Sequence, residues 1–422
     1  MKVVRLALAA GLVVVFLPLA SSGSEGGLPF RIFNRLRLEY DDNIRQEEEN
    51  TDESWKIIEE AEFSLDANLD DTFLGLRYRP SFVWWDDRPE DETDFHHAVD
   101  LVFNHKFSPR FSLGLKDTLR RAELPELVEE GRVVRENNDY LYNSFEGGLT
   151  TVLQPDTRMD FSGRYLTLRY DDDDVADRED YDIYVAGLTI YHNIVPESSI
   201  GMDLRFQTAD YKSALNRDSD DYQVGAAFQQ VFNPNLFANL RVGYERKDLD
   251  EAQGDIQDTP YGEISVTFLP SPATRLTGGA GYSLFETDVY PFGNQTRTRL
   301  FANLAHDLTA KISVYLSGIY TKGDYDGDDL PQGATLRDLP AKVIEEIAPG
   351  VSGAALDAPL TDEFIDAVSD KSEDIYQVSA RVTYKVNRAN WLEAGWQYSK
   401  LDSDLREDFE RNRIHVGWKL RL

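Results

Sequence analysis

Apolar and polar side chains alternate along most of this chain with the two-residue period of β-strands. In the last segment, residues 410–422, Ile414, Val416 and Trp418 share one face, while arginine, histidine and lysine residues occupy the other. Such a strand can lie between hydrocarbon and water, because its two faces point to opposite sides. Comparable runs recur from residue 30 onward, and they predict about eighteen strands of roughly ten residues each.

Two kinds of interruption separate these runs, and they alternate along the chain. Short ones rich in Asn, Asp or Pro include 68–71 and 154–157, and long acidic ones include 41–54 and 122–139. This order predicts an all-β fold: a transmembrane up-and-down antiparallel β-barrel with short periplasmic turns and long acidic extracellular loops. An even number of strands places both chain ends on the periplasmic side.

Two stretches depart from the simple pattern. Within 158–170 and 181–191 the alternation breaks phase, and we interpret the break as a β-bulge. The longest interruption, 323–373, is expected to be a partly helical extracellular loop, with short helices at 340–347 and 362–368. It could fold into the mouth as a constriction or lid, or decorate the outer surface.

The N-terminus has the composition of a secretory signal. Lys2 and Arg5 precede an apolar run, which ends in the small residues Ala20, Ser21 and Ser22. We expect residues 1–22 to be a signal peptide that is cleaved on export, and residues 23–422 to form the barrel. An N-terminal membrane anchor is the alternative.

Composition narrows the classes of function. The 422 residues include 76 acidic and 44 basic side chains, a net charge of −32, which argues against a nucleic-acid partner. The chain contains no cysteine, so disulfides, thiolate metal sites and cysteine nucleophiles are excluded. Mean hydropathy is −0.46, and beyond residue 20 no apolar run approaches the ~20 residues of a membrane helix.

The face opposite the apolar one carries more basic than acidic residues. If it lines a lumen, that lumen is positive although the chain is negative, and it would favour anionic solutes. We select eight arginines as candidate pore-lining residues: Arg35, Arg37, Arg77, Arg79, Arg297, Arg299, Arg411 and Arg413. Arg35, Arg37, Arg411 and Arg413 form the sharpest patch, because the first and last strands must meet when the barrel closes. Alternatively, the arginines pair with inward carboxylates such as Glu39, Glu60 and Glu62.

Catalytic and metal chemistry find little support. The histidines are scattered, and His96 and His97 would point to opposite faces of a strand. No catalytic or phosphate-binding motif is present, so we expect no enzyme activity and no cofactor. The acidic runs 171–174 and 324–329 could offer oxygen ligands to calcium, but solvated loop charge is the favoured interpretation, and no metal site is expected.

The first predicted strand ends in Tyr40, Asp41, Asp42 and Asn43, and an acidic loop and a long series of hairpins follow. In this respect the chain resembles the beta-barrel porin type 2 family of bacterial outer-membrane proteins over nearly all of its mature length. The resemblance implies a porin-like barrel in the bacterial outer membrane, and it supplies no binding or catalytic residues. The amphipathic strand that ends at Leu422 also resembles the C-terminal signal by which such barrels are recognised for assembly.

Three functions are compatible with this sequence. The leading hypothesis is a porin-like channel for passive diffusion of small solutes, with a bias toward anions. The alternatives are a conduit for an acidic exopolysaccharide, and a plugged barrel that acts as an adhesin or scaffold. The expected partners are outer-membrane lipid and lipopolysaccharide, the barrel-assembly machinery through the C-terminal strand, and a small anionic solute or acidic polysaccharide.

Overall fold

The structure is a computed structural model of the chain. It describes residues 30–49, 51–88, 92–122, 138–212, 217–249, 256–287, 289–327, 330–369 and 371–422. The predicted signal peptide, residues 1–22, lies outside the described residues. Among the described residues, no helix is both long and apolar enough to cross a membrane.

Antiparallel strands make up most of the described chain, and each pairs with its neighbours in sequence. The eighteen strands are β1 (Phe30–Asp41), β2 (Ser54–Leu69), β3 (Thr72–Trp85), β4 (Thr93–Ser108), β5 (Phe111–Ala122), β6 (Tyr140–Gln154), β7 (Thr157–Tyr170), β8 (Tyr181–Val195), β9 (Ser198–Tyr211), β10 (Ser219–Asn233), β11 (Leu236–Leu249), β12 (Ile256–Ser271), β13 (Thr274–Glu286), β14 (Asn294–Thr309), β15 (Ile312–Tyr325), β16 (Lys371–Lys385), β17 (Asn390–Ser403) and β18 (Phe409–Arg421).

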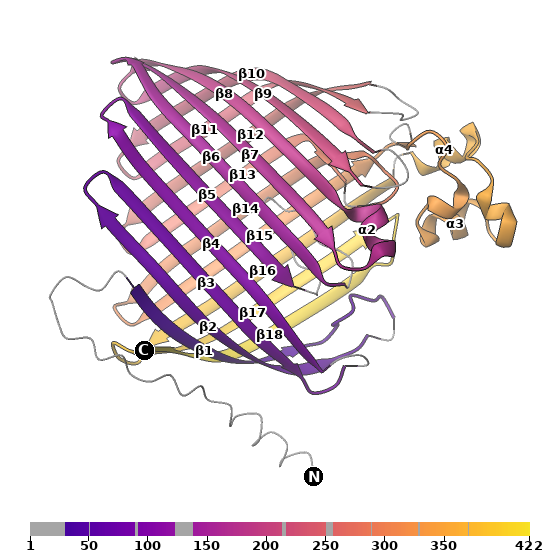
Figure 1. Cartoon of the computed structure of the whole chain (residues 1–422), viewed down its shortest axis with the longest axis horizontal. Coiled ribbons are helices and arrows are strands. Elements are labelled where there is room, and N and C mark those ends of the chain that lie inside the picture. Colours follow the sequence, from indigo (N-terminus) through magenta and orange to yellow (C-terminus); the bar gives the residue numbers. More distant parts are fainter. Residues whose placement is uncertain are drawn as a thin grey trace, which may run out of the picture.

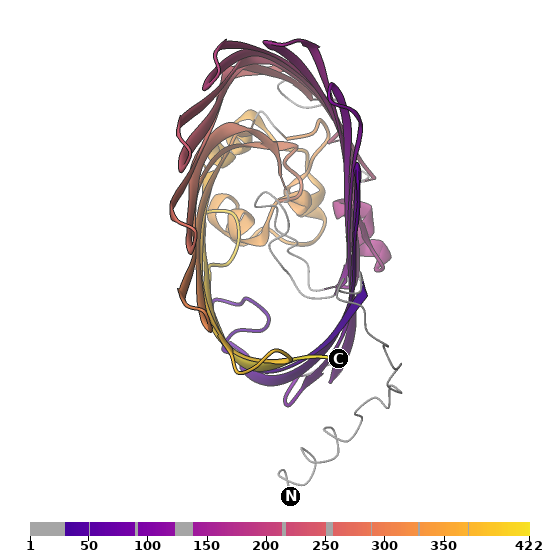
Figure 2. The same cartoon turned by 90° about the vertical axis from the view of Figure 1, so that its left-hand side faces the viewer.

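The sheet closes on itself, because β1 pairs with β18 as well as with β2. The seam runs in register from Phe33 opposite Arg421 to Asp41 opposite Arg413. Figure 1 shows the strands tilted across the wall, and Figure 2 shows an oval cross-section. The predicted fold, a closed antiparallel barrel of about eighteen strands, is confirmed.

The two ends of the barrel differ. At one end short turns join the strands, as between Leu69 and Thr72, and the C-terminus lies there (Figure 1). We call this the short-turn end. The opposite, long-loop end carries the helices α2 (Asp173–Glu179), α3 (Ala341–Ile347) and α4 (Asp362–Val368), together with the 3₁₀ turns η3 (Leu336–Asp338) and η4 (Gly353–Asp357). The helices anticipated at 340–347 and 362–368 correspond to α3 and α4.

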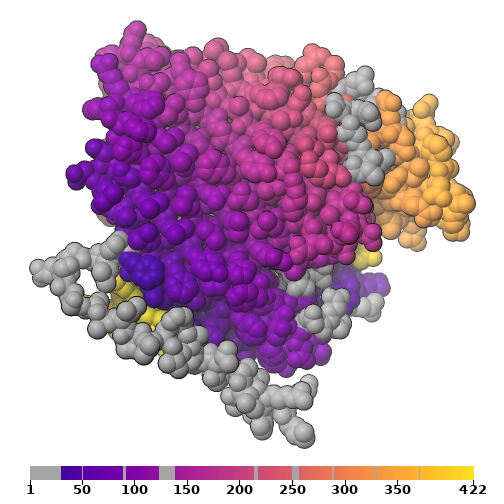
Figure 3. Space-filling model, viewed as in Figure 1, coloured from indigo at the N-terminus to yellow at the C-terminus, as the bar shows by residue number. Residues whose placement is uncertain are grey.

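The outer face of the barrel carries the apolar side chains that a bilayer requires. Leu36, Val378 and Val416 are exposed on it, and similar residues recur on nearly every strand of the wall. Figure 3 shows one side of this outer surface in space-filling form. Glu59 is a charged exception on this face. It lies opposite Leu36 on the neighbouring strand, and its carboxylate accepts a hydrogen bond of 3.0 Å from Asn34 Nδ2.

The prediction of a β-bulge within 158–170 and 181–191 is wrong. Pairing between β6 and β7 is continuous from Tyr140–Tyr170 to Val152–Arg158, and pairing between β7 and β8 is continuous throughout. The phase changes because the inner face becomes apolar near the long-loop end. Leu166, Leu168 and Tyr170 join a buried cluster with Tyr140, Tyr142, Tyr181, Ile183, Ala209 and Tyr211, against which Val175 and Ala176 of α2 pack.

The insertion between β15 and β16 forms a second apolar core. We call residues 330–369 the cap. Leu330, Val343 and Val368 are fully buried in it, and Phe292 and Leu405 join them from the β13–β14 and β17–β18 loops. The cap projects beyond the rim in Figure 1 and lies within the outline of the bore in Figure 2, so it overhangs the mouth.

Replacing Val378 with Arg should destabilise the barrel in lipid by about 2–4 kcal/mol, because an outward guanidinium at mid-strand faces hydrocarbon. Ser379→Arg, one residue further and on the inner face, is the matched control and should cost less than 1 kcal/mol. Equilibrium unfolding of refolded protein in lipid vesicles measures both. Equal losses in the two variants would contradict the assignment of the faces.

Candidate functional site

A buried charge network lies where β1 meets β18, near the long-loop end. Arg411 donates two hydrogen bonds to the Asp41 carboxylate, at 2.9 and 2.6 Å, and both side chains are almost fully buried. The ammonium group of Lys56 lies 3.1 Å from the same carboxylate and 2.8 Å from that of Glu39. Buried charges of this kind are stable only when each one is paired. Arg411 therefore stabilises the barrel wall by pairing with Asp41.

Arg35 and Arg37 lie further along β1 on the same inner face. Arg35 Nε donates to Glu393 at 2.5 Å, and its Nη1 lies 3.7 Å from Glu60. Arg37 Nη1 lies 4.0 Å from Glu39. Both guanidinium groups therefore have carboxylates beside them, as the pairing interpretation expects.

The four-arginine patch is divided in the structure. Arg413 lies opposite Asp41, whereas Arg37 lies opposite Gly417. A displacement of four residues along a strand is about 13 Å. The seam therefore brings the two strands together but separates Arg413 from Arg37, and the Glu39 carboxylate lies between them.

The remaining candidates also lie on the inner face, each with its own neighbour. Arg77 Nε lies 3.6 Å from Glu62, and Arg79 donates to Asp100 at 2.8 Å. The two arginines of β14 lie over aromatic rings. Arg297 is 3.4 Å from the Phe285 centroid, and Arg299 is 5.1 Å from that of Phe301.

A second buried network holds the wall at β10–β13. Lys247 donates to Glu286 at 2.7 Å, and both side chains are about 1 % exposed. Gln223 bridges two further carboxylates, since its amide nitrogen lies 3.0 Å from both Asp221 and Glu245. These groups support the structure of the wall near the mouth.

Arg217 joins the loops at the mouth. Its guanidinium is buried between the rings of Tyr211 and Tyr290, at 4.2 and 5.2 Å, and it donates to the Phe292 carbonyl. It also donates to the Arg178 carbonyl at the end of α2. Burial, together with the Asp338 carboxylate, raises the pKa of Tyr290 to about 12, so this phenol remains a hydrogen-bond donor.

The cap is fixed to the neighbouring β17–β18 loop through Lys342. Its ammonium group donates to the Ser403 carbonyl at 2.6 Å and lies 3.2 Å from the Asp408 carboxylate. On the other side, Tyr290 donates to Asp338 at 3.4 Å. The cap is thus attached to two loops and overhangs the space between them.

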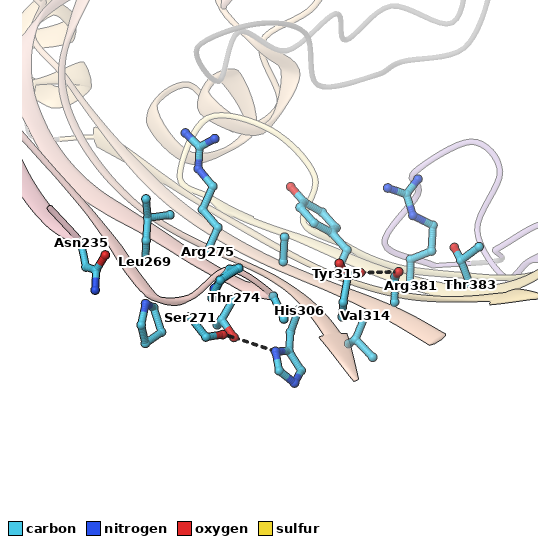
Figure 4. A pocket seen from close by; sticks show the side chains of 16 residues that line it. Asn235, Leu269, Ser271, Thr274, Arg275, His306, Val314, Tyr315, Arg381 and Thr383 are labelled. Carbon is cyan, nitrogen blue, oxygen red and sulfur yellow. Dashed lines mark hydrogen bonds between the residues drawn. The ribbon is translucent and has the colours of Figure 1, made fainter. Parts of the chain in front are cut away.

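The inner wall is hollowed at the short-turn end. A cavity of about 660 Å³ is lined by Arg275, Tyr315 and Arg381, with Asp307 and short-turn residues at its edge (Figure 4). None of these three residues was among the eight sequence candidates. The alternation around Tyr315 indicates its inward face, but nothing local indicates that these side chains meet.

The described residues offer no metal centre, since no group of three histidine or carboxylate side chains in them lies close enough to share an ion. Within the acidic run 171–174, Asp172 caps α2 by accepting from the amides of Asp174 and Val175. Asp171 pairs with Arg121. In the run 324–329, residues 328 and 329 lie outside the described residues.

Comparison with protein families decides the identity. A family model described as "Putative beta-barrel porin 2" matches residues 34–332 and 331–422. The chain belongs to this family. Membership and the closed barrel together make it a porin channel of the bacterial outer membrane. The resemblance seen in the sequence is confirmed.

Among solved structures, the chain is similar to Pseudomonas aeruginosa OccK3 (OpdO), with a TM-score of 0.45, 11 % identity, and coverage of 93 % of this chain and 96 % of that one. The P. aeruginosa outer membrane protein opdK gives a TM-score of 0.44 and 12 % identity, with coverage of 93 % of this chain and 99 % of that one. P. aeruginosa OccK2 (OpdF), solved in complex with glucuronate, gives a TM-score of 0.45 and 11 % identity, with coverage of 93 % of this chain and 98 % of that one. At this similarity their ligands say nothing about this chain. No curated protein matches it.

Arg411→Met should lower the unfolding free energy by about 3 kcal/mol or more, because the Asp41 carboxylate would remain buried with one partner fewer. The control is Arg337→Met, which breaks an exposed pair with Asp357 on the cap and should leave the free energy of unfolding nearly unchanged. Unfolding in lipid measures both. A loss below 1 kcal/mol for Arg411→Met would show that the seam does not need this pair.

Proposed function

We propose that this porin passes small solutes by passive diffusion and favours anions. The observation that carries the proposal is the distribution of paired and unpaired charge on the inner face. Near the long-loop end the basic groups are buried against carboxylates, as in the Arg411–Asp41 and Lys247–Glu286 pairs. Near the short-turn end several basic groups lack such partners.

These exposed groups are Lys106, Arg275, Arg381 and Lys385. All four lie on the inner face, and within the described part of the chain none forms an ion pair. A positive wall in a confined aqueous path raises the local concentration of anions. The chain's net charge of −32 does not oppose this, because much of the acid lies in loops such as 171–174.

The sign of the selectivity tests the proposal. In a planar bilayer under a KCl gradient, the reversal potential of the wild-type channel should indicate preference for chloride. Reversing the charge of two wall residues, in Lys106→Glu/Lys385→Glu, should shift that potential toward cation preference. Lys400→Glu, on the outer face, should leave it unchanged.

Each other outcome has a defined meaning. Cation preference in the wild type would overturn the anion proposal, while the channel itself would stand. A complete lack of conductance in correctly folded protein would favour the plugged barrel with an adhesin or scaffold role. A conduit for an acidic exopolysaccharide would use the same basic wall, and it would be favoured if an acidic polymer, but not its monomer, blocked the current.

We further infer that the cap narrows the entrance, since it overhangs the mouth. The β13–β14 and β17–β18 loops, which flank the cap along the rim, hold it in place. Val343→Asp should loosen the cap, because it places a carboxylate in a fully buried apolar position. Single-channel conductance should then rise. Ala355→Asp adds the same charge at an exposed cap position and should change conductance little. Equal conductance in both variants and the wild type would make the cap a surface decoration.

A further inference from the structure

The cavity at the short-turn end is built on one row of the sheet. Arg275 of β13 lies opposite Ala305, Ala305 opposite Tyr315, and Tyr315 opposite Arg381 of β16. Four adjacent strands thus place two arginines, a phenol and one small side chain side by side in one row across the sheet. Neighbouring strands are about 4.8 Å apart, so the two arginine backbones are separated by roughly 14 Å.

The side chains of this row share one side of the wall. In Figure 4, Arg275, Tyr315 and Arg381 point the same way, with Tyr315 between the arginines, and His306 and Val314 point to the other side. That other side is the outer face, because the nearby Leu276 and Val382 are exposed on it. The methyl group of Ala305 leaves a recess between Arg275 and Tyr315.

The two guanidinium groups are available to a ligand. Both arginines are exposed, and among the described residues neither has an acidic partner. Arg381 lies over the Tyr315 ring at 5.5 Å. The acidic residue of the cavity lining is Asp307, whose carboxylate accepts a hydrogen bond of 2.6 Å from Ser313. Two positive charges therefore face one negative charge.

Neutral polar groups adjoin the row on the side toward the mouth. Asn303 Oδ1 accepts from the Tyr315 hydroxyl at 3.2 Å and from Ser317 Oγ at 2.7 Å, which leaves the Asn303 amide nitrogen as a donor toward the bore. Ser317, Ser379 and Gln397 continue this second row across β15 to β17. They line a smaller cavity of about 300 Å³ that reaches Arg413.

We propose that Arg275, Tyr315 and Arg381 form a binding site for a small hydroxylated carboxylate on its way through the bore. The arginines bind the carboxylate through charge-assisted hydrogen bonds. The Tyr315 ring packs against the carbon skeleton over the Ala305 recess, and the amide and hydroxyl row receives the hydroxyl groups. A cavity of about 660 Å³ is within the usual range for small ligands. The site rests on the proposed channel function and names the class of anion that the channel selects.

The test uses gluconate as a probe in single-channel recordings in KCl, added from the short-turn side, with glucose as its uncharged counterpart. Gluconate should reduce the wild-type current at concentrations at which glucose has no effect. In Arg275→Gln/Arg381→Gln the half-blocking concentration should rise about tenfold or more, because both charge-assisted contacts are removed.

Two further variants separate a site from a general charge effect. Arg158→Gln removes an arginine that follows a short turn on β7, as Arg275 does on β13, but pairs with Asp160. It should change the half-blocking concentration less than twofold. Ala305→Leu fills the recess without changing charge, and it should weaken block about tenfold while chloride preference is kept.

An unchanged block in Arg275→Gln/Arg381→Gln, or an equal loss in Arg158→Gln, would overturn the site and leave the channel proposal intact. If neither the wild type nor any variant conducts, the channel proposal fails, and calorimetric titration of gluconate into the folded protein in detergent decides the site separately. Binding that is lost in the double arginine variant would then support it, and binding that is unaffected would refute it.

Discussion

The structure depends on a requirement of the bilayer: hydrocarbon provides no hydrogen-bond partners, so every backbone amide and carbonyl in the span must pair within the protein. A β-sheet meets this requirement only when it closes, and here closure is the pairing of β1 with β18. The side chains reinforce the seam. Arg411 joins β18 to Asp41 of β1, and Arg35 reaches past β18 to Glu393 of β17.

Closure also fixes how the inner wall holds its charge. Around the seam, arginines and a lysine are buried with carboxylates, and at β10–β13 Lys247 is buried with Glu286, so these basic groups are paired within the wall. Toward the short-turn end the wall is open to the bore, and Arg275 and Arg381 are exposed there. The field that a solute meets is therefore set by which charges are paired, more than by how many the wall contains.

Near the mouth the barrel packs like a soluble protein. The inner face of β6–β9 is apolar there, and α2 packs on it; the cap has its own core with Val343 at the centre. In these regions apolar residues face inward, so the alternation that marks a lipid-facing strand no longer holds. This explains why Leu166 and Leu168 look out of phase in the sequence although β7 pairs without interruption.

The sequence by itself determined the barrel, the order of short turns and long loops, the positions of α3 and α4 and the inward face of the eight candidate arginines. Each of these follows from local periodicity, which a bilayer enforces residue by residue. It could not determine the partners of those arginines, because Arg35 meets a carboxylate 358 residues away. It also could not bring Arg275, Tyr315 and Arg381 into one row. That row exists only through three strand pairings, and the register of a pairing is a property of the closed sheet, which no single strand contains.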